Sequence, residues 1–166
     1  MSRYNTIIKN DVTNGEGVCV SFFVQGCPHH CKGCFNEETW SFSLGKEYDS
    51  KVKWEVIEAI GANGIERNFS VLGGEPMAPQ NLEMVEELVT AVRHAYPKIT
   101  IYLWTGYQFE DLISNPANNI QQILDCVDVL IDGVFVESLK DLSLNLRGSS
   151  NQHIYIKKNN NWELKE

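Results

Sequence analysis

The sequence has 166 residues, of which 43% are hydrophobic and 22% are charged. A chain of this length fits one domain and buries roughly 68–70% of the surface that it exposes when unfolded, so a core forms without disulfides. The 14 Lys and Arg residues are outnumbered by 22 Asp and Glu residues, which gives a net charge of −8. This acidic balance disfavours a general binder of nucleic acid or of anionic membranes.

The first residues lack the apolar segment of a secretory signal, and no stretch reaches the ~18 apolar residues of a membrane span. Three of the five cysteines, Cys27, Cys31 and Cys34, lie within eight positions. An extracellular disulfide framework usually spreads an even number of cysteines along a smaller chain. We therefore expect a soluble, cytoplasmic protein whose clustered thiols bind metal or carry out redox chemistry.

The predicted elements alternate between strands and helices along the chain. Four short apolar runs have the composition of strands buried on both faces: residues 18–24, 69–72, 99–104 and 127–131. Apolar residues at helical spacing predict the helices, over residues 50–60, 80–94 and 118–126. Asp49 or Ser50 can cap the first helix. Residues 153–157 alternate in the way of an edge strand.

This alternation predicts an α/β fold with a mainly parallel sheet. A complete eight-fold barrel takes ~250 residues, so this chain can form only a partial, incomplete β/α barrel or an open sheet. Active sites of such folds lie at the carboxyl ends of the strands. The groups that carry chemistry each follow a predicted strand: the cysteine cluster, Gly73 to Pro76, Thr105 and Asp132.

The cysteine cluster lies in residues 26–36, Gly-Cys-Pro-His-His-Cys-Lys-Gly-Cys-Phe-Asn, with the pattern C-x-x-x-C-x-x-C. Thiolates at this spacing can converge from a tight loop on one inorganic cluster. An electron-transfer 4Fe-4S cluster normally has four cysteine ligands, so three leave one iron open, as a catalytic metal site requires. The alternatives are a structural zinc with His29 or His30 as a further ligand, and a redox pair of Cys31 and Cys34.

Two motifs together resemble the radical S-adenosylmethionine superfamily. They are the cysteine loop after the first predicted strand and Gly73-Gly74-Glu75-Pro76 after the second. Within the superfamily, the chain resembles the activating proteins of anaerobic ribonucleoside-triphosphate reductase from about Asn14 to Gln152. The further motifs of this resemblance are Trp104-Thr105-Gly106-Tyr107, Asp128-Val129-Leu130-Ile131-Asp132-Gly133 and Arg147-Gly148-Ser149-Ser150-Asn151-Gln152. Gly33 stands where the superfamily usually has an aromatic residue, and Phe35 follows the third cysteine, as is usual in this branch.

The resemblance implies a single radical S-adenosylmethionine domain over residues 1–166. Cys27, Cys31 and Cys34 would hold a 4Fe-4S cluster, and S-adenosylmethionine would bind the open iron. Reductive cleavage would give methionine and a 5′-deoxyadenosyl radical, which abstracts a hydrogen from one glycine of the reductase large subunit and leaves a glycyl radical. The electron would come from a reductant such as flavodoxin or ferredoxin, with no nucleic acid or membrane involved.

The resemblance also implies the site residues. Gly73 and Gly74 let the backbone approach the methionine amino group, and Glu75 accepts hydrogen bonds from it. The full implied cofactor-binding set is Phe35, Asn36, Gly73, Gly74, Glu75, Pro76, Thr105 and Asp132, and the implied substrate or carboxylate loop contains Arg147, Asn151 and Gln152. From the residues alone, these segments are equally well explained as ordinary turns and a polar loop without a binding role.

Four residues near or outside these motifs have less specific expectations. His29 and His30 are expected to modify the surroundings of the cluster rather than ligate it. Cys19 and Cys126 lie on predicted apolar elements and are expected to be buried, inert thiols.

Other functions stay open on the sequence. An incomplete barrel leaves a side that can admit a protein loop, which favours a macromolecular substrate. The enzymatic alternatives are an activator of another glycyl-radical enzyme and a radical enzyme acting on a small metabolite. The alternative from another class is a zinc-binding adaptor without catalysis.

Overall fold

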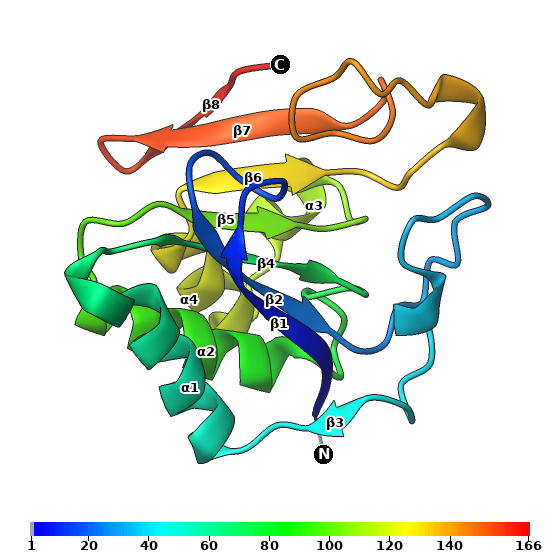
Figure 1. Cartoon of the computed structure of the whole chain (residues 1–166). Helices are drawn as coiled ribbons and strands as arrows, with labels where there is room; N and C mark the ends of the chain where they lie inside the picture. Colours follow the sequence, from blue (N-terminus) through cyan, green and yellow to red (C-terminus); the bar gives the residue numbers. More distant parts are fainter. Residues whose placement is uncertain (1) are drawn as a thin grey trace.

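A single eight-stranded sheet organises the computed structural model, which describes residues 2–166 (Figure 1). The strand order is β3-β1-β2-β4-β5-β6-β7-β8. The central strands run parallel: β2 (Cys19–Val24), β4 (Asn68–Gly73), β5 (Ile101–Trp104) and β6 (Val129–Asp132). The outer strands pair antiparallel: β1 (Arg3–Asp11), β3 (Lys46–Glu47), β7 (His153–Lys158) and β8 (Asn161–Leu164).

The four central strands confirm the predicted buried strands and the α/β fold, but the expected mainly parallel pairing holds only for the middle of the sheet. All six residues of β2 and all four of β6 are buried, as their apolar composition indicates. The strands follow one another in a linear order with β3 and β8 at the edges, and closure into a partial barrel stays a prediction. The expectation of an edge strand at residues 153–157 is wrong in one respect, because β8 covers the outer side of β7. Asn159 and Asn160 both have positive φ, 51° and 63°, as a tight hairpin turn requires.

Three helices confirm the helical periodicity: α1 (Ser50–Ile60), α2 (Leu82–Ala95) and α4 (Asn118–Cys126). Asp49 caps α1 by accepting hydrogen bonds from the backbone N–H groups of Lys51 and Val52. The short helix α3 (Phe109–Ser114) was not predicted. None of the helices in residues 2–166 combines the length and the hydropathy needed to cross a membrane.

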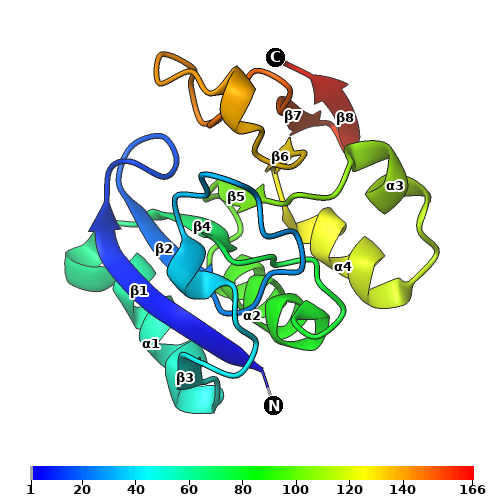
Figure 2. The same cartoon turned by 90° about the vertical axis from the view of Figure 1, so that its right-hand side faces the viewer.

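The two faces of the sheet are covered differently. Helices α1, α2 and α4 pack on one face, where fully buried residues such as Phe22, Leu88 and Ile123 form the main core (Figure 2). The other face carries a smaller cluster around Tyr102 and Ile131, which loops rather than helices cover. The carboxyl ends of the parallel strands all point to the right in Figure 1, where the cysteine loop and the segment after β6 lie.

The loop between β1 and β2 lies over this second face and is held by Asp11. The Asp11 carboxylate accepts hydrogen bonds from Thr13 N (2.9 Å) and Oγ1 (2.8 Å), Asn14 Nδ2 (2.7 Å) and Ser21 Oγ (2.7 Å). Burial opposes ionisation, but the hydrogen bonds from Ser21, Thr13 and Asn14 outweigh it and lower the pKa of Asp11 to about 2. The ionised carboxylate therefore stabilises the fold.

We expect Asp11→Asn to lower the free energy of unfolding by about 2 kcal/mol at pH 7, because its amide NH₂ would face donors and the charge-assisted bonds would be lost. The lowered pKa of Asp11 adds to the free energy of unfolding. This stabilisation is fully present above pH 3.8, the ordinary pKa, and is lost as the pH falls through about 2. Urea unfolding of the wild type and Asp11→Asn at pH 7 and pH 3 measures their free energies of unfolding. The difference between the two proteins should be smaller at pH 3 than at pH 7.

The matched control is Asp141→Asn, since exposed Asp141 also accepts hydrogen bonds from a backbone N–H and a hydroxyl, both of Ser143. This variant should unfold like the wild type. Equal stability of Asp11→Asn and wild type at pH 7 would contradict the role of Asp11.

Candidate functional site

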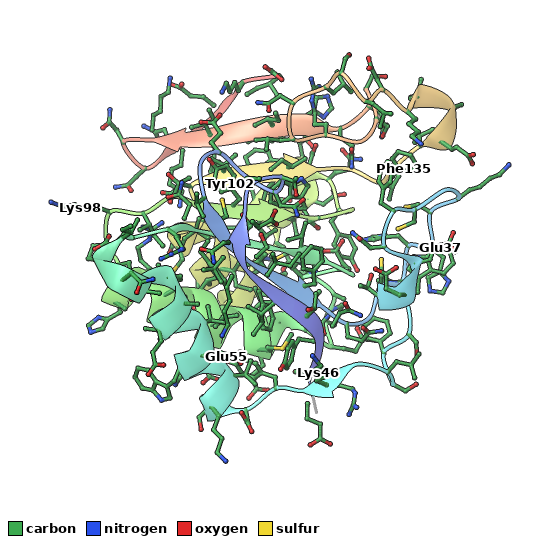
Figure 3. All side chains as sticks on the ribbon, viewed as in Figure 1. Glu37, Lys46, Glu55, Lys98, Tyr102 and Phe135 are labelled. Carbon is green, nitrogen blue, oxygen red and sulfur yellow. The ribbon has the colours of Figure 1, made fainter. Side chains whose placement is uncertain are left out.

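The cysteine loop leaves the carboxyl end of β2 and is closed at its base by backbone hydrogen bonds. Gly26 N donates to Thr39 O at 2.6 Å, and Cys27 N donates to Trp40 O at 3.0 Å. Farther along, Cys34 N donates to Cys31 O at 3.1 Å. Glu37, which follows the loop, marks its position on the right of Figure 3. The loop thus presents three half-buried thiols from one compact segment.

A cavity of about 450 Å³ lies between this loop and the carboxyl ends of β4, β5 and β6. Its volume is in the range of small-molecule and cofactor sites. Predicted residues in its lining are Cys27, Cys31, Cys34, Phe35, Asn36, Gly73, Gly74, Glu75, Thr105, Arg147 and Gln152. The structure therefore brings together most of the predicted site, from segments that are far apart in the sequence.

The three thiols are free and partly buried in the absence of any disulfide within residues 2–166. Burial raises the pKa of Cys27 to about 11 and the pKa of Cys31 above its ordinary value. Binding of iron would therefore displace protons from these thiols. Within residues 2–166, no group of three or more His, Cys, Asp or Glu side chains is placed to hold one metal ion.

The Gly-Gly-Glu turn after β4 packs directly against the start of the cysteine loop. Gly74 N donates to Val24 O at 3.0 Å, and Glu75 N donates to Gly26 O at 2.8 Å. A Cβ at Gly74 would lie 2.4 Å from Gly26 O, so only glycine fits at this contact. The two motifs of the sequence are thus joined backbone to backbone.

The Glu75 side chain is 1% exposed and faces four hydrogen-bond donors. Oε1 lies 2.6 Å from Gly106 N and 2.7 Å from His29 Nε2. Oε2 accepts from Thr105 Oγ1 at 2.7 Å and from Met77 N at 2.8 Å. Thr105 therefore lies in the site as predicted and contacts Glu75 directly. The bond from His29 was not foreseen, since the sequence suggested only that His29 lies near the cluster.

Phe35 and Asn36 lie at the cysteine side of the cavity. Phe35 is 56% exposed, and its ring centroid is 5.1 Å from that of Phe135, which Figure 3 labels on the loop beyond β6. Lys140 Nζ lies 5.2 Å from the Phe35 ring. The aromatic pair connects the cysteine loop to the segment that follows β6.

Arg147 brings positive charge to the cavity lining. Its Nη1 donates to Gln152 O at 3.2 Å, and its Nη2 pairs with Glu166 Oε2 at 3.1 Å. Within residues 2–166, its buried Nε has no hydrogen-bond partner. Gln152 shapes the same loop, because its Oε1 accepts from Gly148 N at 2.8 Å. Because Arg147 lines the cavity, its guanidinium suits an anionic ligand group there.

Three predicted residues, Pro76, Asp132 and Asn151, lie outside the cavity lining. Asp132 is fully buried, and its carboxylate accepts hydrogen bonds from Phe109 N at 2.8 Å and His153 N at 3.1 Å. Asn151 Nδ2 donates to Val134 O at 2.8 Å. Asp132 and Asn151 thus hold the segments that form the cavity wall.

The remaining cysteines and His30 are placed away from the cavity. Cys19 is fully buried as expected. The expectation of burial is wrong for Cys126, which is only half-buried because it ends α4 at the edge of the core. His30 is exposed and stacks on Trp40, with ring centroids 4.5 Å apart.

Several lining residues were not singled out from the sequence. Thr13 and Asn14 reach the cavity from the β1–β2 loop, and Leu144 and Leu146 also line it, beside Trp104 of a motif already noted. Trp104 Nε1 donates to Leu146 O at 2.8 Å, which holds the 134–152 segment on the sheet. The only sequence signal for Asn14 is its place before Gly15 in a turn.

Comparisons with known proteins agree with this geometry. The family model of the 4Fe-4S single cluster domain matches residues 13–155. The chain is 40% identical to the anaerobic ribonucleoside-triphosphate reductase-activating protein of Pasteurella multocida (strain Pm70), over 92% of this chain and 96% of the relative. It is 38% identical to the protein of that name from Escherichia coli (strain K12), over 92% and 97%. The phage T4 protein of that name is 35% identical, over 97% and 98%.

These matches span nearly the full length of both partners and include the cysteine loop, the Gly-Gly-Glu turn and the cavity. The chain therefore has a 4Fe-4S single cluster domain and belongs to the family of anaerobic ribonucleoside-triphosphate reductase-activating proteins.

Proposed function

We propose that this protein is a radical S-adenosylmethionine enzyme that generates the glycyl radical of anaerobic ribonucleotide reductase. The observation that carries the proposal is the convergence of three cysteines and the Gly-Gly-Glu turn on one cavity of about 450 Å³. The names of the relatives support the reductase as the partner.

Cys27, Cys31 and Cys34 hold the 4Fe-4S cluster in this proposal and leave one iron for S-adenosylmethionine. When bound, the reduced cluster and cofactor supply a 5′-deoxyadenosyl radical for hydrogen abstraction. The protein places the thiols in a partly buried loop, closed at its base by the Gly26 and Cys27 backbone bonds.

The cofactor's methionine end is assigned to the turn after β4. Gly73 and Gly74 line the cavity and let this turn pack closely on the backbone around β2, and the Glu75 carboxylate accepts from the ammonium. Arg147, which lines the cavity, is the cation that suits the cofactor carboxylate. This assignment uses opposite charges of two residues that line the same cavity.

Other predicted residues complete the pocket in this proposal. Thr105 orients Glu75 through its 2.7 Å hydrogen bond. Phe35 and Asn36 line the cysteine side, where Phe35 offers an aromatic surface for the adenine. Pro76 and Asp132 support the lining from outside it, and the loop of Asn151 and Gln152 forms the wall around Arg147.

The substrate in this proposal is a glycine-bearing loop of the reductase large subunit. The exposed Phe35 ring at the cavity wall provides apolar surface that a polypeptide can cover. The electron comes from a protein reductant such as flavodoxin or ferredoxin, and we place the reaction in the cytoplasm.

We expect Ala at Cys27, Cys31 or Cys34 to abolish the cluster, because each thiolate binds a separate iron. Cys126→Ala serves as the control and should retain the cluster, since Cys126 lies outside the cavity. Iron and sulfide analysis and the visible absorbance of anaerobically prepared protein measure this. A colourless wild type with stoichiometric zinc would support the zinc-binding adaptor instead.

We expect Glu75→Gln to keep the cluster but to weaken S-adenosylmethionine binding by roughly ten- to a hundred-fold, the effect of losing a hydrogen bond to a charged group. Calorimetric titration of the cluster-loaded protein measures the affinity. Glu37→Gln is the matched control, because exposed Glu37 follows the same loop and lies outside the cavity lining. Unchanged affinity in Glu75→Gln would remove Glu75 from the binding site.

We expect anaerobic mixing with the reductase large subunit, S-adenosylmethionine and a reductant to produce a glycyl radical on that subunit. Electron paramagnetic resonance should detect its doublet, which should vanish when the receiving glycine becomes alanine. Formation of deoxyadenosine without any doublet would keep the radical chemistry and reject this substrate. Another glycyl-radical enzyme or a small metabolite would then be the target.

A further inference from the structure

The four donors around Glu75 occupy its full capacity as an acceptor. A carboxylate offers about four lone-pair positions, two on each oxygen. His29 and Gly106 occupy Oε1, and Thr105 and Met77 occupy Oε2. The Glu75 side chain is 1% exposed, so solvent offers no further position. A cofactor ammonium can therefore reach this carboxylate only by replacing one of the four donors.

Three of these donors are fixed by the fold. The donors from Gly106 and Met77 are backbone N–H groups of the turns after β5 and β4. Thr105 is 5% exposed, and its hydroxyl also accepts a hydrogen bond from Tyr107 N at 3.1 Å. These groups cannot leave Glu75 without moving the turns themselves.

His29 is the donor that can leave. It lies in the cysteine loop, lines the cavity and is 15% exposed. Its bond to Glu75 is the only side-chain hydrogen bond that it makes within residues 2–166. The ring otherwise rests edge-on to Tyr107, with centroids 4.8 Å apart, and over Gly106, where a Cβ would lie 2.5 Å from its Cδ2. One hydrogen bond and one aromatic contact hold the ring.

We infer that His29 occupies the ammonium position of the cofactor site and is displaced when the cofactor binds. The inference rests on the proposed function, because it assumes that Glu75 receives the methionine ammonium. In the protein without cofactor, the imidazole N–H keeps the buried carboxylate satisfied, which avoids the cost of an unpaired buried charge. When the cofactor binds, its ammonium replaces the His29 N–H as a hydrogen-bond donor to Glu75.

This exchange makes the site selective for a ligand that carries an ammonium group. A nucleoside without the amino-acid portion has nothing to offer Glu75 in place of His29, so it leaves the ring where it is. His29 also lies between two cluster ligands, Cys27 and Cys31. Arrival of the ammonium therefore releases a contact of the loop that holds the cluster.

The test measures S-adenosylmethionine affinity of the cluster-loaded protein by calorimetry. We expect His29→Ala to bind about tenfold more tightly than the wild type, because the competing hydrogen bond to a charged group is gone. His30→Ala is the matched control and should bind like the wild type, since His30 stacks on Trp40. Methylthioadenosine, which lacks the amino-acid portion, should bind equally to wild type and His29→Ala.

A second variant, Gly106→Ala, tests the inference independently if His29→Ala fails to assemble the cluster. Gly106→Ala places a Cβ against the His29 ring and should push it from Glu75, with tighter binding of S-adenosylmethionine as the result. Unchanged or weaker S-adenosylmethionine binding in both variants would overturn the inference. A gain that also appears with methylthioadenosine would overturn it as well. Failure of the cluster-loaded wild type to bind S-adenosylmethionine would instead reject the proposed function.

Discussion

The buried carboxylate of Glu75 is the interaction on which the arrangement of the cavity depends. It joins three segments that the sheet places side by side: the cysteine loop, the turn after β4 and the turn after β5. A buried charge is tolerated only when its hydrogen bonds are complete. The irregular segments around Glu75 are therefore held to one another by the requirement to satisfy this group, and the cavity forms between them.

The central fold was predictable because burial on both faces leaves a strong signal. Residues 18–24, 69–72, 99–104 and 127–131 are continuous apolar runs, and the helices between them have a clear apolar stripe. Strands β1 and β8 were missed because they are partly exposed and carry many polar residues. Helix α3 has only six residues, which is too short for helical periodicity to appear.

The site was predictable where chemistry depends on local spacing. The three cysteines and the Gly-Gly-Glu turn are short motifs, and both reach the cavity. The contacts of His29 and Asn14 depend on how loops meet across the sheet. Such contacts cannot be predicted from the periodicity of the sequence. The sequence indicated Glu75 as an acceptor, but it could not show that protein donors already surround the carboxylate.

Within residues 2–166, the hydrophobic core contains no residue between positions 25 and 47. The cysteine loop is instead attached through backbone hydrogen bonds at its base and contacts at the cavity. Small metal-dependent domains differ from this arrangement, because they unfold when the metal leaves. Here the core that holds the sheet and helices together is formed outside the cysteine loop. The segment that carries the reactive thiols is thus distinct from the segments whose packing stabilises the fold.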